Sequence, residues 1–104
     1  MESLIAHGGS DVILLDLRGL TVIADHFVIG TVETSIQMRA FRDAADSTLA
    51  AESAAHPRFE GEFEDGWVLA DFGATIVHVF SPDARTYYRL EELWADAPTI
   101  LHVQ

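Results

Sequence analysis

Residues 66–98 read GWVLADFGATIVHVFSPDARTYYRLEELWADAP, and this stretch decides the fold of the chain. It holds six of the ten aromatic residues. Residues 67–72 and 75–80 are apolar runs of strand length, rich in β-branched and aromatic side chains, with Gly73 and Ala74 between them. A glycine that opens a two-residue loop is typical of a β-hairpin. The stretch therefore predicts two antiparallel strands joined by a tight turn.

The expected register of this hairpin pairs Leu69 with His78 and Trp67 with Phe80. Because side chains alternate along a strand, one face of the hairpin is expected to carry Trp67, Leu69, Asp71, Ile76, His78 and Phe80. The other face is expected to carry Val68, Ala70, Val77 and Val79. Both faces are largely apolar, which predicts a central hairpin that is covered on both sides.

A helix over residues 82–90 is predicted directly after the hairpin. Ser81 is a favoured N-cap residue, Pro82 suits the first helical position, and Asp83 complements the helix dipole in the first turn. A further turn at residues 91–95 is expected to end at Pro98.

The N-terminal half predicts two strands and a long helix, after a short helix or frayed arm at residues 1–7. Residues 11–17 form an apolar run flanked by acids, which fits a strand buried on both faces, and residues 25–30 are the second strand. Thr34 and Gln37 have the spacing of a capping box. They open an alanine-rich helix predicted to run to residue 55, where His56 and Pro57 end it. Its apolar stripe consists of Met38, Phe41, Ala45 and Leu49.

The remaining segments complete an α/β fold. Residues 58–65 are an acidic link, with Phe59 and Phe63 as candidates for a short edge strand, and residues 99–103 are a last edge strand. The sequence therefore predicts one domain over residues 1–104, with a mixed sheet of about five strands packed against helices 34–55 and 82–90.

The composition bounds the function. Six arginines and no lysine face seventeen acidic residues, so the formal net charge is −11. Such a surface repels nucleic acid and anionic membranes and attracts a basic partner, although acidity can also serve solubility alone. Cysteine is absent, which excludes disulfides and a thiol nucleophile. Apolar runs are too short for a membrane span, and the first residues lack signal-peptide features, so a cytoplasmic protein is expected.

Catalytic patterns are weak. Gly8, Gly9 and Ser10 precede a strand, and Asp16, Asp71 and His78 lie on predicted strands, as in nucleotidyltransferases that bind magnesium and a nucleoside triphosphate. However, neither an Asp-x-Asp pair nor a lysine for the triphosphate is present. A metal site built from His26, His78 and Asp71 lacks the close ligand spacing of known motifs. This enzyme is therefore the alternative hypothesis, not the leading one.

Residues 83–96 offer a binding surface instead. Aromatic and aliphatic side chains alternate here with arginines and acids, which is typical of interface hot spots. The alternative interpretation is that Tyr88, Leu93 and Trp94 only seal one face of the hairpin. The pattern alone favours neither interpretation.

Two blocks of the chain resemble the ribosomal silencing factor family, also called the Iojap family. The first is residues 11–41, DVILLDLRGLTVIADHFVIGTVETSIQMRAF. The second block lies between residues 60 and 97. Its matching positions are residues 60–61, GWVL at 66–69, HVF at 78–80, Arg85, Tyr88, and residues 90–91, 93–94 and 96–97. The chain departs from the family pattern at His26, Phe72 and Ala74, at residues 31–33, and in its shorter N-terminal helix.

The resemblance implies a protein that binds the large ribosomal subunit through ribosomal protein L fourteen, blocks its association with the small subunit and represses translation. It further implies a nucleotidyltransferase-like fold without catalytic residues or cofactor, a homodimer when free, and no direct readout of nucleic acid. The residues expected on the partner surface are Trp67, His78, Phe80, Tyr88, Leu93, Trp94 and Asp96.

Overall fold

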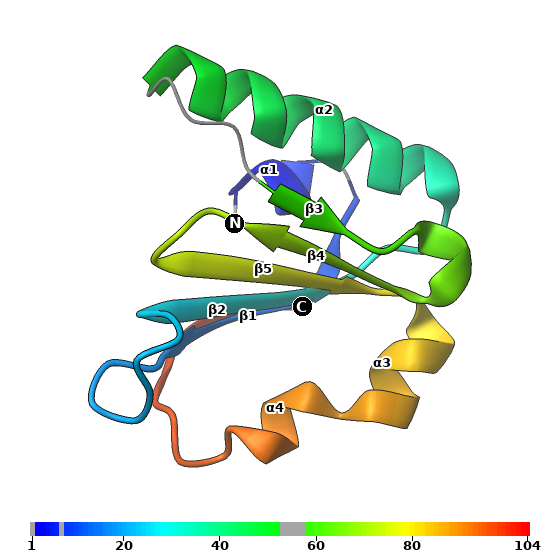
Figure 1. Ribbon diagram of the computed structural model, residues 1–104. Coiled ribbons are helices and arrows are strands. Elements are labelled where there is room, and N and C mark those ends of the chain that lie inside the picture. Colours follow the sequence, from blue (N-terminus) through cyan, green and yellow to red (C-terminus); the bar gives the residue numbers. More distant parts are fainter. Residues whose placement is uncertain (1, 7, 53–57) are drawn as a thin grey trace.

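A six-stranded mixed sheet with helices on both faces organises the chain (Figure 1). The structure is a computed structural model that describes residues 2–6, 8–52 and 58–104. Its elements are α1 (Glu2–Ala6), β1 (Ser10–Asp16), β2 (His26–Thr31), α2 (Ser35–Glu52), β3 (Arg58–Glu60), the 3-10 helix η1 (Phe63–Asp65), β4 (Trp67–Asp71), β5 (Thr75–Phe80), α3 (Pro82–Tyr88), α4 (Leu90–Leu93) and β6 (Thr99–Val103).

The strand order is β3-β4-β5-β2-β1-β6, so strands from both halves of the sequence meet in the middle of the sheet. Only the pairing of β2 with β5 is parallel among the described strands; the other four pairings are antiparallel. The predicted α/β class and mixed sheet are confirmed. The likeness to nucleotidyltransferases stays a prediction.

The predicted strand count of about five is corrected to six because the acidic link forms the edge strand β3, which pairs with β4. Phe59 lies in this strand, but Phe63 does not. Phe63 begins η1 instead, where Glu62 and Asp65 cap each other's backbone and Gly66 closes the turn with a φ of 85°. Capping within the link therefore turns the chain before β4 begins.

The register of the β4–β5 hairpin is confirmed. Trp67 pairs with Phe80 and Leu69 pairs with His78, while the backbone N–H of Phe72 donates to the carbonyl of Thr75 at 2.9 Å. Gly73 has a φ of 92°, a conformation that glycine adopts without strain. The turn residue thus fixes which side chains lie on which face of the sheet.

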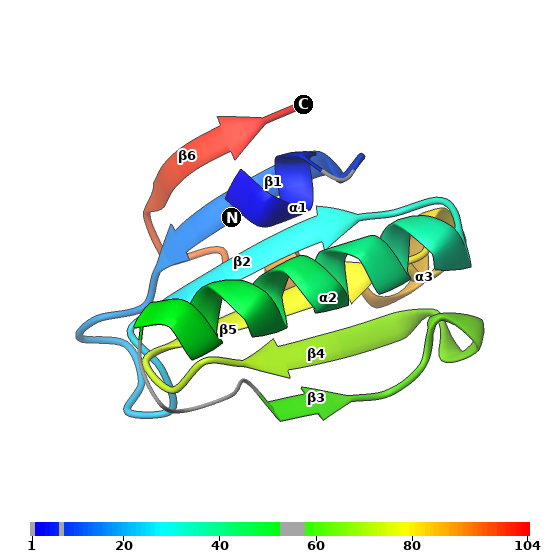
Figure 2. The same cartoon turned by 90° about the horizontal axis from the view of Figure 1, so that it is seen from above.

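Helix α2 covers one face of the sheet, lying across its middle strands (Figure 2). Its N-terminus has the predicted capping box: the Gln37 N–H donates to Thr34 Oγ1 at 3.1 Å, and the Thr34 N–H donates to Gln37 Oε1 at 3.2 Å. Met38 and Phe41 are buried, as predicted. The side chains of Ala45 and Leu49, and the predicted helix end at residues 53–57, lie outside the described residues. Strand residues packed on this face are Val12, Val28, Val68, Ala70, Val77 and Val79.

Helices α3 and α4 cover the opposite face (Figure 1). Ser81 caps α3 as predicted, since its Oγ accepts from the Ala84 N–H at 3.3 Å and Pro82 follows. The predicted single helix over residues 82–90 is interrupted at Arg89, whose φ of 48° is left-handed, and α4 then begins at Leu90. None of the helices described here is both long and apolar enough to cross a membrane.

Candidate docking surface

An aromatic surface lies on the α3–α4 side of the sheet; we call Trp67, Tyr87, Tyr88, Leu93 and Trp94 the α3–α4 surface. Tyr87 is 80% exposed and Leu93 is 75% exposed, whereas Tyr88 is 43% exposed. The rings are in contact: Tyr88 lies 4.9 Å from Trp67 and 5.0 Å from Tyr87 between ring centroids. This cluster therefore runs from solvent down to the sheet.

His78 and Phe80 support this surface from below. Phe80 is fully buried, with its ring centroid 4.9 Å from that of Trp67. His78 is 5% exposed, and its Nδ1 accepts a hydrogen bond from Trp67 Nε1 at 3.1 Å. Burial lowers the pKa of His78 to about 4, so the ring is neutral at pH 7. Since Nδ1 accepts, the proton of the neutral ring lies on Nε2.

Trp94 is half-buried at the C-terminal end of α4. Its ring meets Phe27 edge to face at a centroid distance of 5.5 Å, and Phe27 meets His78 in the same way at 4.5 Å. Trp94 therefore has one side in the core and one side toward solvent. It can contribute both to packing and to contact with a partner.

The seven residues expected on the partner surface thus lie in three layers. Phe80 and His78 are buried, Trp67 and Trp94 are half-buried, and the exposed members are Tyr88, Leu93 and Asp96. These seven do not include Tyr87, which lies within the predicted binding segment 83–96 and is more exposed than Tyr88 beside it. The double tyrosine was the available signal, because adjacent residues on a helix point in different directions.

Acidic side chains border the α3–α4 surface. Asp83, Glu92 and Asp96 are exposed, and the nearby Arg89 is paired with Glu92 at 3.9 Å. Among the ion pairs of the described residues, none involves Asp83 or Asp96. Exposed apolar side chains beside these two carboxylates suit a partner that is basic and has apolar contacts to offer.

The residues of the enzyme hypothesis do not form one site. Asp16 accepts hydrogen bonds from the backbone and side chain of Arg18, at 3.0 and 2.9 Å, and the Arg18 guanidinium holds the pKa of Asp16 well below its usual range. Asp71 accepts from the Gly73 N–H at 2.8 Å within the hairpin turn, and His78 is bonded to Trp67. Each of the three has a local partner of its own. In the part of the chain that the structure describes, no group of three or more acidic or histidine side chains is placed to hold a metal ion.

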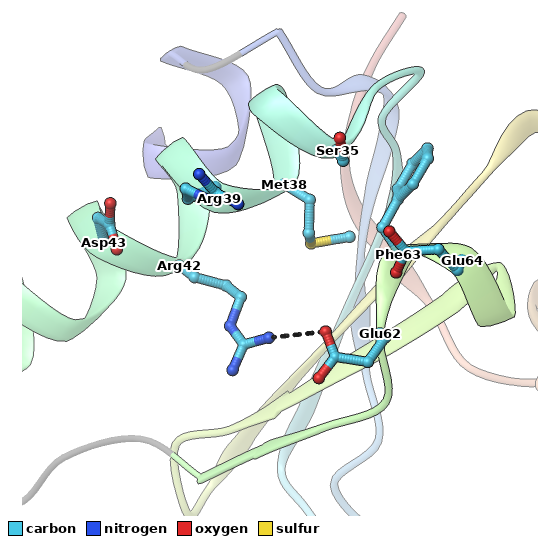
Figure 3. A pocket seen from close by; sticks show the side chains of 8 residues that line it. All are labelled: Ser35, Met38, Arg39, Arg42, Asp43, Glu62, Phe63 and Glu64. Atoms are coloured by element: carbon cyan, nitrogen blue, oxygen red, sulfur yellow. Dashed lines mark ion pairs between the residues drawn. The ribbon is translucent and has the colours of Figure 1, made fainter.

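A polar pocket lies on the opposite side of the sheet, between α2 and η1 (Figure 3). Its volume is about 380 Å³. Met38 points into it, and Arg42 reaches across to Glu62 at 3.8 Å while its guanidinium stacks over Phe59. Carboxylates and guanidinium groups both line the pocket, so its charges largely compensate each other.

A second set of exposed apolar side chains is not part of the α3–α4 surface. It comprises Leu20, Val22 and Ile23 in the β1–β2 connection and Ile100 and Leu101 on the edge strand β6. Sequence reasoning assigned these residues to a connection and an edge strand but did not identify them as exposed.

The fold and the α3–α4 surface define a small α/β protein whose candidate site is an aromatic, acid-bordered surface. A family model described as "Ribosomal silencing factor during starvation" matches residues 1–104. A ribosomal silencing factor from Bacillus subtilis is 40% identical over 92 residues, covering 85% of this chain and 75% of the relative. The chain therefore belongs to the ribosomal silencing factor family.

More distant relatives and solved structures agree. A mouse protein named "Mitochondrial assembly of ribosomal large subunit protein 1" is 32% identical over 73 residues, covering 67% of this chain and 32% of its own length. A crystal structure of a protein from Chromobacterium violaceum superposes with a TM-score of 0.81 at 32% identity, covering 90% of this chain and 78% of that one. The predicted family resemblance is thus confirmed.

Proposed function

We propose that this protein represses translation by binding ribosomal protein L fourteen on the large ribosomal subunit and blocking association with the small subunit. The α3–α4 surface is the single observation that carries the proposal, since exposed aromatic and aliphatic side chains stand there among carboxylates. Ribosomal proteins that contact RNA are basic, so an acidic surface is attracted to them, whereas ribosomal RNA repels it. Membership of the silencing factor family and the name of the mouse relative support a ribosomal target.

The test is subunit joining with purified components. Large subunits are incubated with the protein, small subunits are added, and joined ribosomes are separated by sedimentation. We expect the protein to travel with free large subunits and the fraction of joined ribosomes to fall as its concentration rises. Unchanged joining at saturating protein would refute the proposal.

We further propose that the action is steric and needs neither a catalytic residue nor a cofactor. The carboxylates of the enzyme hypothesis are held by Arg18 and by the Gly73 turn, which supports this view. A protein that bound a nucleoside triphosphate with magnesium would gain melting temperature by mass action. We expect no gain. A saturable gain that disappears in Asp16→Asn or Asp71→Asn would favour the nucleotidyltransferase-like alternative.

The free protein is proposed to be a cytoplasmic homodimer that buries the α3–α4 surface and dissociates to bind the ribosome. An apolar surface of this kind is costly to leave in water, so a second copy and the ribosome would compete for it. Sedimentation should then show one copy per large subunit. Two copies on each subunit would instead place the dimer contact elsewhere, and the exposed set around Val22 and Leu101 would be the first candidate.

A further inference from the structure

Arg85 is a charged side chain inside the protein. It lies on α3 and is 7% exposed, which places it with Thr31 and His78 among the buried polar residues of the described chain. Its Nη1 donates to Thr31 Oγ1 at the end of β2 at 3.0 Å, and its Nε donates to Glu91 Oε1 in α4 at 3.1 Å. One guanidinium therefore ties α3 to the sheet and to α4.

The same guanidinium also reaches β1. Arg85 Nη2 is 3.4 Å from Asp11 Oδ2, and Asp11 Oδ1 is 2.6 Å from His102 Nε2 on β6. Asp11 has a φ of 50°, and the β1–β2 register shifts between Ser10 and Ile13. A left-handed non-glycine residue persists where surrounding contacts hold it. The network thus extends from α4 to the far edge of the sheet.

Stability alone does not account for a buried arginine. Replacing a buried ion pair by apolar side chains of similar volume is often neutral or stabilising, because both charges lose their hydration on burial. The Asp11 and Glu91 side chains are 52% and 30% exposed, so both could turn to water if Arg85 were apolar. What an apolar side chain cannot supply is a directional bond.

The hydrogen bond from Arg85 to Glu91 acts on α4, whose orientation its own backbone does not fix. The backbone turns through the left-handed Arg89 between α3 and α4, and α4 is only four residues long. A helix this short is not stable by its own hydrogen bonds and takes its orientation from tertiary contacts. Leu93 is the last residue of α4 and Trp94 is its C-cap. The orientation of α4 therefore sets where both side chains of the α3–α4 surface stand.

We propose that Arg85 is a positioning residue: through Glu91 it holds α4 in the orientation in which Leu93 and Trp94 meet a basic protein partner. The identity of the partner rests on the proposed function. The hydrogen bond between Arg85 and Glu91, which we call the tether, is a property of the free protein. Thr31 and Asp11 anchor the guanidinium to the sheet, and Glu91 transmits that anchor to α4.

The test is a double-mutant cycle on the full chain with Arg85→Met, Glu91→Leu and both together. Affinity for purified large subunits is measured by sedimentation, and unfolding is followed in urea. Each single variant should bind about tenfold more weakly. The double variant should bind no more weakly than either single one, because both changes remove the same interaction.

Two further variants serve as controls. Glu91→Gln should bind like the wild type, since its amide oxygen can still accept from Arg85 Nε. Arg58→Met removes an exposed arginine on the edge strand β3 and is the matched control. It should leave the affinity for large subunits unchanged.

Amide hydrogen exchange of the free protein separates the tether from the proposed function. Exchange in residues 90–96 should quicken about tenfold in Arg85→Met and in Glu91→Leu, while exchange in α2 stays unchanged. Unchanged exchange in residues 90–96, or additive losses in the cycle, would overturn the positioning role. If the wild type does not bind large subunits, the proposed function fails, and the exchange result still decides whether the tether exists. If Arg85→Met does not fold, Glu91→Leu carries the same test from the more exposed partner.

Discussion

The two faces of the β4–β5 hairpin differ in what covers them. On one face Val68, Ala70, Val77 and Val79 pack under α2, a helix of 18 residues, and all four are buried. On the other face Trp67, His78 and Phe80 lie under α3 and α4, which have seven and four residues. The first face is aliphatic and closed; the second is aromatic and leaves Tyr87 and Leu93 in solvent.

This difference separates stability from recognition within one pair of strands. Burial of the aliphatic face contributes to folding in proportion to the apolar area removed from water. Exposed Tyr87 and Leu93 contribute little to folding, so they are free to serve a partner. The half-buried Trp67 and Trp94 connect the two roles. Substitutions on the two faces should therefore affect different measurements.

The largest effect on stability is expected on the α2 face. Phe41 lies on α2, and its ring is 1% exposed in the core between this helix and the sheet. Phe41→Ala should lower the free energy of unfolding by about 3–5 kcal/mol, because it removes a buried ring and leaves a cavity. Urea unfolding measures this, and binding to large subunits per folded molecule should be unchanged. Arg39→Ala, an exposed change on the same helix, is the control; equal losses in both variants would show that α2 is not packed as described.

The next effect is a pH dependence that originates beneath the aromatic face. The pKa of His78 is about 4 in the folded protein against 6.5 for an ordinary histidine, because burial disfavours the charged ring. The unfolded chain therefore binds a proton first as pH falls. The free energy of unfolding therefore contains a term from neutral His78 that is fully present above pH 6.5. This term is lost as the pH falls toward 4, which lowers the free energy of unfolding by up to about 3 kcal/mol.

Urea unfolding between pH 7.5 and 4 checks this window. His78→Phe should flatten the pH dependence there, because a phenyl ring can occupy the space and does not titrate. The low pKa of Asp16 acts in the more acidic range, where stability falls as that carboxylate is protonated. A slope between pH 6.5 and 4 that survives His78→Phe would contradict the assignment.

Trp94→Ala should affect both the free energy of unfolding and the affinity for large subunits. Removing a half-buried ring that contacts Phe27 should lower stability by less than Phe41→Ala does. Binding to large subunits should weaken by roughly 2 kcal/mol, as for an aromatic interface anchor. A loss of stability with no loss of binding would make Trp94 a core residue only.

The sequence predicted the features that depend on local patterns. The hairpin register follows from alternation around Gly73, and the starts of α2 and α3 follow from Thr34 with Gln37 and from Ser81 with Pro82. Alternation could not show how far α3 and α4 extend over the aromatic face. The family resemblance placed buried Phe80 and exposed Leu93 in one predicted site, and the sequence pattern could not separate them.

Long-range and unusual backbone features escaped prediction. Arg85 and Thr31 are 54 residues apart in sequence, and no local pattern indicates that they meet. The left-handed conformation of Arg89 breaks the predicted helix at a residue type that normally continues one. The edge strand predicted around Phe59 is confirmed as β3, but the predicted strand count does not include it, because it is only three residues long, carries two charges and lacks the apolar run by which strands are identified.

The smallest change in stability offers the most direct test of the central claim. Asp96→Arg alters an exposed charge beside the α3–α4 surface, and Asp43→Arg makes the same change on exposed α2. Both should alter stability by no more than about 0.5 kcal/mol. Sedimentation with purified large subunits compares their affinities. We predict that Asp96→Arg binds at least about tenfold more weakly, because like charges then meet at the basic partner, while Asp43→Arg binds like the wild type. Full binding by Asp96→Arg together with weakened binding by Asp43→Arg would place the docking surface on the opposite face of the sheet and contradict the account.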